Sequence, residues 1–155
     1  MEQLSELMAR YAQPGRVAWI GVRGGRREDV RAVDRARIGP DGLEGDHGVS
    51  GKRAVTLVQG EHLAVIGAML GRGPVEPGDL RRNLVIEGIN LAALKGRQVR
   101  VGGALLEITG ICAPCSRMEE AFGTGGYSAV RGHGGWCAAV LRPGEVRLGD
   151  RVEVA

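Results

Sequence analysis

The chain has 155 residues, of which 43% are hydrophobic and 25% are charged, as in an ordinary globular domain. A net charge of +3, scattered arginines and only five aromatic residues (two Trp, two Tyr and one Phe) argue against a nucleic-acid-binding surface. No apolar run approaches the length of a membrane-spanning helix, and three cysteines suit a reducing, cytoplasmic location better than a disulfide framework.

Short apolar runs between turn residues predict mostly strands, with a few short helices. Residues 1–12 are expected to form a peripheral amphipathic helix, because Leu4, Leu7 and Met8 recur at helical spacing. Alternating or β-branched runs predict strands at 16–22, 30–38, 54–58, 83–86, 98–101, 104–109, 136–141 and 145–154. Further helices are predicted at 61–70, 91–94 and 116–122.

Two pairs of these strands carry hairpin signals. Gly102-Gly103 separates one pair, and Pro143-Gly144 stands between the last two strands. Helices do not alternate regularly with strands, so a doubly wound fold is not expected. We therefore predict a single domain over residues 1–155 that is mainly β, a mixed β-barrel with a few short peripheral helices.

A Cys-x-x-Cys segment, Cys112-Ala-Pro-Cys115, is the sharpest chemical signal. Cys115 stands just before a predicted helix that Ser116 opens, and Ser116 with Glu119 matches a capping box. A thiol at a helix N-terminus with Arg117 beside it is expected to have a lowered pKa. Since the thiolate is the nucleophile and metal ligand, we interpret Cys115 as the reactive residue.

The same cysteines allow three other interpretations. Cys112, Cys115, His133 and Cys137 together have the ligand types and spacing of a structural zinc site. Cys-x-x-Cys is also the motif of thioredoxin-like redox pairs, although the alternating parallel pattern of that fold is missing. The third possibility is that both cysteines are small buried residues near a turn.

Two further segments carry candidate ligand-binding residues. The glycine-rich loop 39–51 is long enough to suggest function; within it, Asp46 and His47 are candidates for a general base or for orienting a ligand. It lacks the Gly-Lys-Ser/Thr ending of a P-loop, and a solvated turn is the alternative. Arg81, Arg82 and Asn83 enter a strand, where they suit an anionic or amide-bearing ligand or form a solvated strand start.

These motifs occur in an order that resembles the MOSC domain family, which is named for the C-terminal domain of molybdenum-cofactor sulfurase. The resemblance covers residues 17–154 and depends on the order of the motifs and on the Pro-Cys element, rather than on any single motif. The segments that carry it are 42–47 (GLEGDH), 53–57, 82–84 (RNL), 88–89, 102–106, 112–118 (CAPCSRM), 131–135 (RGHGG) and 149–152.

The resemblance implies a β-barrel with one reactive cysteine, which maps to Cys115 because it follows Pro114. In larger members this cysteine binds the molybdenum of a pterin cofactor (molybdopterin) or is proposed to carry sulfur, and some stand-alone members are linked to reduction of N-hydroxylated compounds. The implied catalytic residues are Cys115, Asp46 and His47, with Cys115 as metal ligand. The implied cofactor-binding residues are Arg53, Arg81, Arg82, Asn83, Ser116 and Arg117.

The chain also departs from the larger family members. It lacks the additional N-terminal barrel of the larger molybdenum enzymes, and it has no domain of the pyridoxal-phosphate-dependent type, so family labels that mention pyridoxal phosphate are inherited from fused members. Expected partners are a small-molecule substrate and a separate desulfurase or reductase protein. A cofactor-free persulfide sulfur carrier and a non-catalytic, zinc-stabilised barrel are the alternative functions.

Overall fold

The computed structural model describes residues 2–48 and 50–155, so Met1 of the predicted first helix and Val49 of the predicted loop lie outside the described residues. The strands are β1 (Gly15–Arg23), β2 (Val30–Val33), β3 (Arg35–Gly39), β4 (Gly42–Leu43), β5 (Val55–Gln59), β6 (Leu84–Glu87), β7 (Gln98–Val101), β8 (Ala104–Ile111), β9 (Trp136–Arg142), β10 (Gly144–Arg147) and β11 (Arg151–Val154). The helices are α1 (Leu4–Met8), α2 (His62–Met69), α3 (Pro77–Leu80), α4 (Arg117–Phe122), α5 (Gly126–Val130) and the 3₁₀ turns η1 (Gly51–Arg53) and η2 (Leu91–Leu94).

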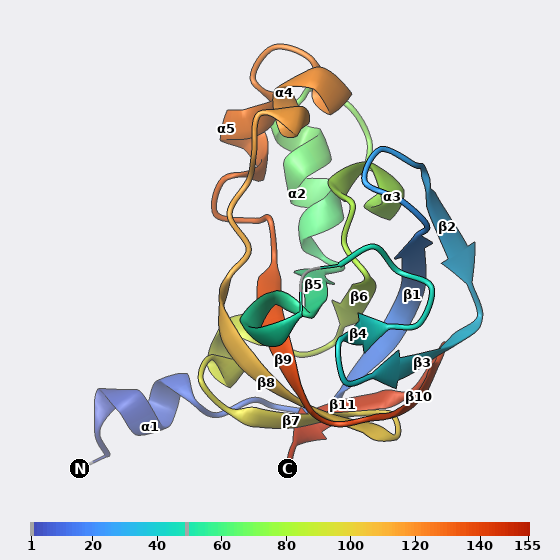
Figure 1. Ribbon diagram of the computed structural model, residues 1–155. Coiled ribbons are helices and arrows are strands. Elements are labelled where there is room, and N and C mark those ends of the chain that lie inside the picture. The colour runs from blue at the N-terminus through green and yellow to red at the C-terminus, as the bar shows by residue number, and fades with distance from the viewer. Residues whose placement is uncertain (1, 49) are drawn as a thin grey trace.

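The main sheet closes on itself. Its order is β11-β7-β8-β9-β5-β6-β1-β2, and a further pairing of β11 with β1 joins seven of these strands into a ring, with β2 outside it (Figure 1). β5 and β6 run parallel, whereas the other neighbours in the ring are antiparallel. The predicted mixed β-barrel is therefore confirmed.

Two layers of apolar side chains hold the barrel and its helices together. One layer fills the barrel, and strand β5 contributes Val55 and Leu57 to it. The other layer lies between the barrel wall and the helices, and it includes Val58, Ile66 and Met118. Since β5 packs on both of its faces, all five of its residues are buried, as is typical of a strand with a parallel neighbour.

The helices gather at one end of the barrel. Figure 1 shows α2, α4 and α5 together above that end, with α3 beside them, while α1 projects away from the opposite end. No helix in the described part of the chain has the length and apolarity that crossing a bilayer requires. The predicted helical segment 91–94 is present as η2, the predicted helices 61–70 and 116–122 are present as α2 and α4 with slightly different ends, and α3 and α5 were not predicted.

The structure corrects two strand predictions. The predicted strand 30–38 is divided at Asp34 into β2, which extends the main sheet, and β3, which pairs with β10 and β4 in a second sheet. The final hairpin is also wrong: β9 pairs with β8 and β5, β10 pairs with β3, and β11 pairs with β7 and β1. The physical reason is barrel closure, because β11 covers strand edges that a local hairpin would leave open.

Gly135 provides a test of the packing at the start of β9. Its φ of +97° disfavours any other residue, and an added Cβ would clash with the carbonyl oxygen of Leu57 on β5. We expect Gly135→Ala to lower the free energy of unfolding by roughly 2–4 kcal/mol, measured by urea denaturation. Gly132→Ala is the matched control, because Gly132 has φ +87° with open space around it, and it should cost only about 1 kcal/mol. Equal losses in the two variants would contradict the close approach.

Candidate functional site

A cavity of about 450 Å³ opens where β1, the loop after β4, and the segment between β8 and α4 come together. We call it the inner cavity. Its lining combines many guanidinium groups with two of the three thiols of the chain. The residues are Arg23, Arg26, His47, Gly48, Arg53, Thr56, Arg81, Arg82, Cys112, Ala113, Cys115, Arg117 and Met118.

Arg82 is the charged residue buried most deeply in this wall. The residue is 8% exposed; its Nε donates to the carbonyl oxygen of Gly134 at 2.7 Å, and its Nη1 donates to that of Leu80 at 3.1 Å. Its Nη2 is buried and has no hydrogen-bond partner among the described residues. A buried guanidinium nitrogen without an acceptor is costly, so this atom favours an anionic or acceptor group of a ligand in the cavity.

Arg23 is held in place by Asp46. The Asp46 carboxylate accepts from the Arg23 main-chain nitrogen at 2.8 Å and from its Nε and Nη2 at 3.3 Å each. The Asp46 side chain is 1% exposed and does not line the inner cavity, whereas Arg23 and His47 do. Asp46 was predicted as a catalytic group; the structure gives it the role of positioning Arg23, and a direct catalytic role stays a prediction.

The two thiols of the cavity have different environments. Cys115 is exposed, whereas Cys112 is 5% exposed and lies near the buried Cys137. A hydrogen bond from the Cys137 thiol and the positive charges of Arg82, Arg53 and Arg23 lower the pKa of Cys112, against the opposing effect of burial. The same hydrogen bond, together with burial, raises the pKa of Cys137. The inner cavity is therefore lined by one accessible thiol, Cys115, and by one buried thiol, Cys112, whose pKa is lowered.

Asn83 holds strands together behind the cavity wall. Its Oδ1 accepts from the main-chain nitrogen and Oγ1 of Thr56 at 3.0 and 3.2 Å, and its Nδ2 donates to the carbonyl oxygen of Gly21 at 3.2 Å. Asn83 is 1% exposed and does not line the inner cavity, although Thr56 does. Asn83 therefore links β5, β1 and the start of β6, and its cofactor contact stays a prediction.

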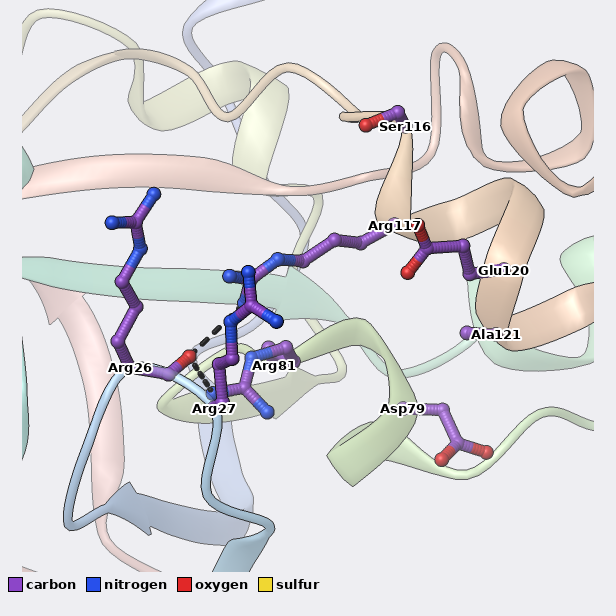
Figure 2. A pocket seen from close by; sticks show the side chains of 8 residues that line it. All are labelled: Arg26, Arg27, Asp79, Arg81, Ser116, Arg117, Glu120 and Ala121. Atoms are coloured by element: carbon purple, nitrogen blue, oxygen red, sulfur yellow. Dashed lines mark hydrogen bonds between the residues drawn. The ribbon is translucent and has the colours of Figure 1, made fainter.

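The remaining predicted cofactor residues line the inner cavity or a space beside it. Arg53 lines the inner cavity, and Arg81 and Arg117 line both it and an adjoining space of about 590 Å³, which we call the outer pocket. Ser116 lines only the outer pocket (Figure 2). The outer-pocket residues are Arg26, Arg27, Asp79, Arg81, Ser116, Arg117, Glu120 and Ala121.

The predicted capping box at the start of α4 is wrong. Ser116 does stand at the N-cap, but its backbone is helical and its side chain makes no cap hydrogen bond. Glu119 instead reaches forward, where its carboxylate accepts from the main-chain nitrogens of Gly125 and Tyr127 at 3.0 and 2.9 Å. These bonds lower the pKa of Glu119 and join α4 to α5.

The predicted zinc site does not form. Across residues 2–48 and 50–155, no three His, Cys, Asp or Glu side chains are arranged to hold a metal ion. His133 pairs instead with His62, with their Nδ1 atoms 3.2 Å apart and the rings edge to face. His133 therefore belongs to a histidine pair and not to a cluster of metal ligands.

Three arginines that line these two spaces were not singled out from the sequence. Arg23 lies just after the predicted strand 16–22, and Arg26 and Arg27 follow the Gly24-Gly25 turn. The available signal was the concentration of arginines directly after that strand. Their convergence with Arg81 and Arg117 depends on tertiary structure, which the local pattern does not contain.

The chain matches one family model and is similar in structure to several solved proteins. The model of the family described as MOSC domain matches residues 44–153. The structure is similar to the YuaD protein from Bacillus subtilis, with TM-score 0.81 and 18% identity over 94% of this chain and 97% of that one. It is similar to YiiM from Escherichia coli (TM-score 0.71, 23% identity, 90% and 69% covered) and YiiM from Geobacillus stearothermophilus (0.76, 20%, 92% and 75%). None of the curated proteins matches the chain.

Substitution of Asn83 tests whether this residue links strands or contacts a ligand. We expect Asn83→Ala to lower the free energy of unfolding by roughly 2–4 kcal/mol, because it leaves the Thr56 N–H and the Gly21 carbonyl without a partner. Urea denaturation would measure the loss. Asn90→Ala is the control: Asn90 is exposed and only caps η2, so about 1 kcal/mol or less is expected. Unchanged stability in Asn83→Ala would restore the interpretation as a ligand contact.

Proposed function

Since the chain belongs to the MOSC domain family, as its match over residues 44–153 establishes, we propose that it binds a molybdenum cofactor in the inner cavity. In this proposal Cys115 is the metal-ligating thiolate. The observation that carries it is the combination of an exposed thiol with a buried, unpartnered guanidinium nitrogen on Arg82 in one cavity.

The residues of the cavity fit such a group. A molybdopterin is anionic, and guanidinium groups bind phosphate in a bidentate geometry that lysine does not reproduce. A thiolate is a soft anionic ligand that suits such a metal. Absence of a three-residue protein metal site among the described residues is compatible with this cofactor, because its pterin supplies ligands of its own and the protein needs to add only one.

Each arginine has a distinct part in the proposal. Arg82 contributes a guanidinium whose buried Nη2 has no partner among the described residues, and Arg53 adds a second positive charge to the same lining. Arg81 and Arg117, at the border with the outer pocket, would hold the more distant part of the ligand, with Ser116 beyond them. Asn83 acts through Thr56, whose position in the wall it fixes.

The proposed reaction needs a bound cofactor, a proton donor and a source of electrons. When bound, the cofactor supplies two-electron redox chemistry, and reduction of an N-hydroxylated compound is the proposed reaction. His47 lies exposed on the cavity wall, where an imidazole is suited to deliver the proton that a departing hydroxyl needs. Asp46 fixes the position of Arg23 in the cavity lining, and its carboxylate offsets part of the charge of that guanidinium. A separate reductase protein would supply electrons.

Metal analysis tests the proposal directly. We expect near-stoichiometric molybdenum, measured by elemental mass spectrometry, in protein from a molybdenum-replete host, and its loss in Cys115→Ser. Cys137→Ala is the matched control: Cys137 is buried outside the cavity lining, so the variant should retain molybdenum if it stays folded, which a melting curve verifies. Equal molybdenum in Cys115→Ser and the unaltered protein would contradict the role of Cys115 as a ligand.

A second candidate function is a persulfide sulfur carrier. It is favoured by the exposure of Cys115, which lets a partner protein reach the thiol, and by the surrounding arginines, which stabilise a persulfide anion. Sulfur would come from a separate desulfurase. Because all three cysteines are free thiols, we further propose that the protein works in a reducing, cytoplasmic environment.

Intact-mass measurement separates this candidate from the first. After incubation with a desulfurase and cysteine, a carrier should gain the mass of one sulfur atom, located on Cys115 by peptide mapping. Cys115→Ser should remain unmodified, whereas Cys137→Ala should still gain the sulfur. Persulfide on Cys115 in molybdenum-free protein would support the carrier; its absence would exclude it.

A further inference from the structure

Two histidines outside the inner cavity and the outer pocket form a contact between α2 and the segment that leads into β9. The Nδ1 atoms of His62 and His133 lie 3.2 Å apart, and the rings meet edge to face with their centroids 4.7 Å apart. His62 is the first residue of α2, and His133 follows α5. In Figure 1, α2 and α5 lie at the end of the barrel where the helices gather, which is also the end that carries the inner cavity.

The segment 132–135 has a single side chain with which it can contact its surroundings. Its sequence is Gly-His-Gly-Gly, so only His133 extends beyond the main chain. Glycine gives the main chain more conformational freedom than any other residue, and Gly132 and Gly135 use that freedom, with φ of +87° and +97°. The histidine contact is therefore the only restraint that a side chain of this segment provides.

The same segment holds two residues of the inner cavity. The Gly134 carbonyl oxygen accepts from Arg82 Nε at 2.7 Å, and the Gly135 carbonyl oxygen accepts from the Cys112 main-chain nitrogen at 2.9 Å. Arg82 and Cys112 both line the inner cavity. The packing is close, because a Cβ on Gly134 would lie only 2.9 Å from the Cys112 carbonyl oxygen. Three consecutive residues, 133–135, therefore connect the histidine pair to a guanidinium and a thiol of the cavity wall.

A contact between two Nδ1 atoms depends on how many protons the two rings carry. When both rings are neutral, or when only one is protonated, one Nδ1 donates and the other accepts, so the hydrogen bond is kept. When both rings are protonated, both Nδ1 atoms carry a hydrogen and two positive charges face each other. The second proton therefore breaks the contact.

Few charges surround His62. The elements α2, α5 and β5 contain no Asp, Glu, Lys or Arg. The charged and titratable groups on these and the adjoining segments are Glu61, Arg16, Glu87, Tyr127, Arg82 and Arg131. Burial first, and then the charge of His133, lower the pKa of His62, and the Glu61 carboxylate offsets this effect in part.

The direction of the pH effect follows from the lowered pKa. A histidine whose pKa is lower in the folded protein stabilises the folded arrangement above its ordinary pKa of about 6.5, and this contribution is lost as the pH falls through the lowered value. His62 also lines a surface pocket of about 380 Å³, through which protons reach it from solvent. The contact is therefore intact at neutral pH and is broken in mild acid.

We propose that the pair of His62 and His133 is a pH-sensitive positioning device for the wall of the inner cavity. At neutral pH the pair holds the segment 132–135 in place, and with it Arg82 and Cys112. In mild acid the segment is released, and both residues lose their main-chain acceptors. The device belongs to the cavity wall itself, so it operates whichever ligand the cavity takes.

Nuclear magnetic resonance of protein without added molybdenum tests the proposal, because the chain has only three histidines to assign. We expect the His62 ring to titrate with a pKa below its ordinary value. The reporters of the wall are the Arg82 Nε–H and the Cys112 main-chain N–H. Their protection from hydrogen exchange, corrected for the intrinsic effect of pH, should fall roughly 10-fold between pH 7.5 and 5.5, because one pH unit below the ordinary pKa shifts the equilibrium about tenfold.

Three variants identify the group responsible. In His62→Gln the fall in protection should disappear, because a carboxamide does not titrate. His47→Gln is the matched control, since it removes the histidine that lines the inner cavity and leaves the pair unaltered, so the fall should remain. It should also remain in Cys112→Ala, which removes a thiol whose pKa is lowered to about 6 and keeps the reporting N–H. A melting curve verifies that each variant is folded.

Three results would overturn the proposal. They are an equal fall in protection in His62→Gln, loss of the fall in His47→Gln or Cys112→Ala, and constant protection while the His62 ring titrates. Every measurement uses protein without molybdenum or a sulfur donor. Failure of either proposed function would therefore leave the result unchanged, and the inferences fail separately.

Discussion

The closure of the barrel by β11 is the constraint on which the other features depend. β11 pairs with β7 along one edge and with the first residues of β1 along the other, so the ring leaves no open edge between them. With its first residues fixed in that way, β1 runs through the ring to Arg23, at the end where the helices gather. The turn that carries Arg26 and Arg27 follows β1 directly. The site is therefore built at the end of a strand that belongs to the closed ring.

Charge is distributed unequally around this end of the barrel. Arg23 has a buried carboxylate partner in Asp46, Arg82 has two carbonyl partners and one free nitrogen, and Arg26 and Arg27 have no close carboxylate among the described residues. Unpaired like charges oppose folding, whereas they contribute to binding once an anion arrives. The apolar interior of the barrel and the hydrogen bonds of Asn83 stabilise the fold. The protein therefore tolerates the repulsion between the unpaired arginines of the site.

Local patterns in the sequence predicted what depends on local structure. The Gly102-Gly103 hairpin, the short strands and the three later helices are present, because hydrophobic period and turn residues determine them. The last hairpin failed because β11 has partners far away in the chain, and the capping box failed because Glu119 found donors in the next helix. In the site, the segment with Cys115 was singled out from the sequence and lies in a cavity. The pairing of Asp46 with Arg23 and the orientation of Asn83 were not predicted, because they depend on contacts between distant segments.

The pairing of Gly15 with Val152 also has a consequence for synthesis on the ribosome. The first strand emerges early, but its partner along that edge is translated after nearly all of the other elements. During elongation the early strands hold an exposed edge, and the ring cannot form until β11 has left the exit tunnel. Closure of the ring is then expected to be a late step of folding, because the edge of β1 stays unpaired until β11 is available.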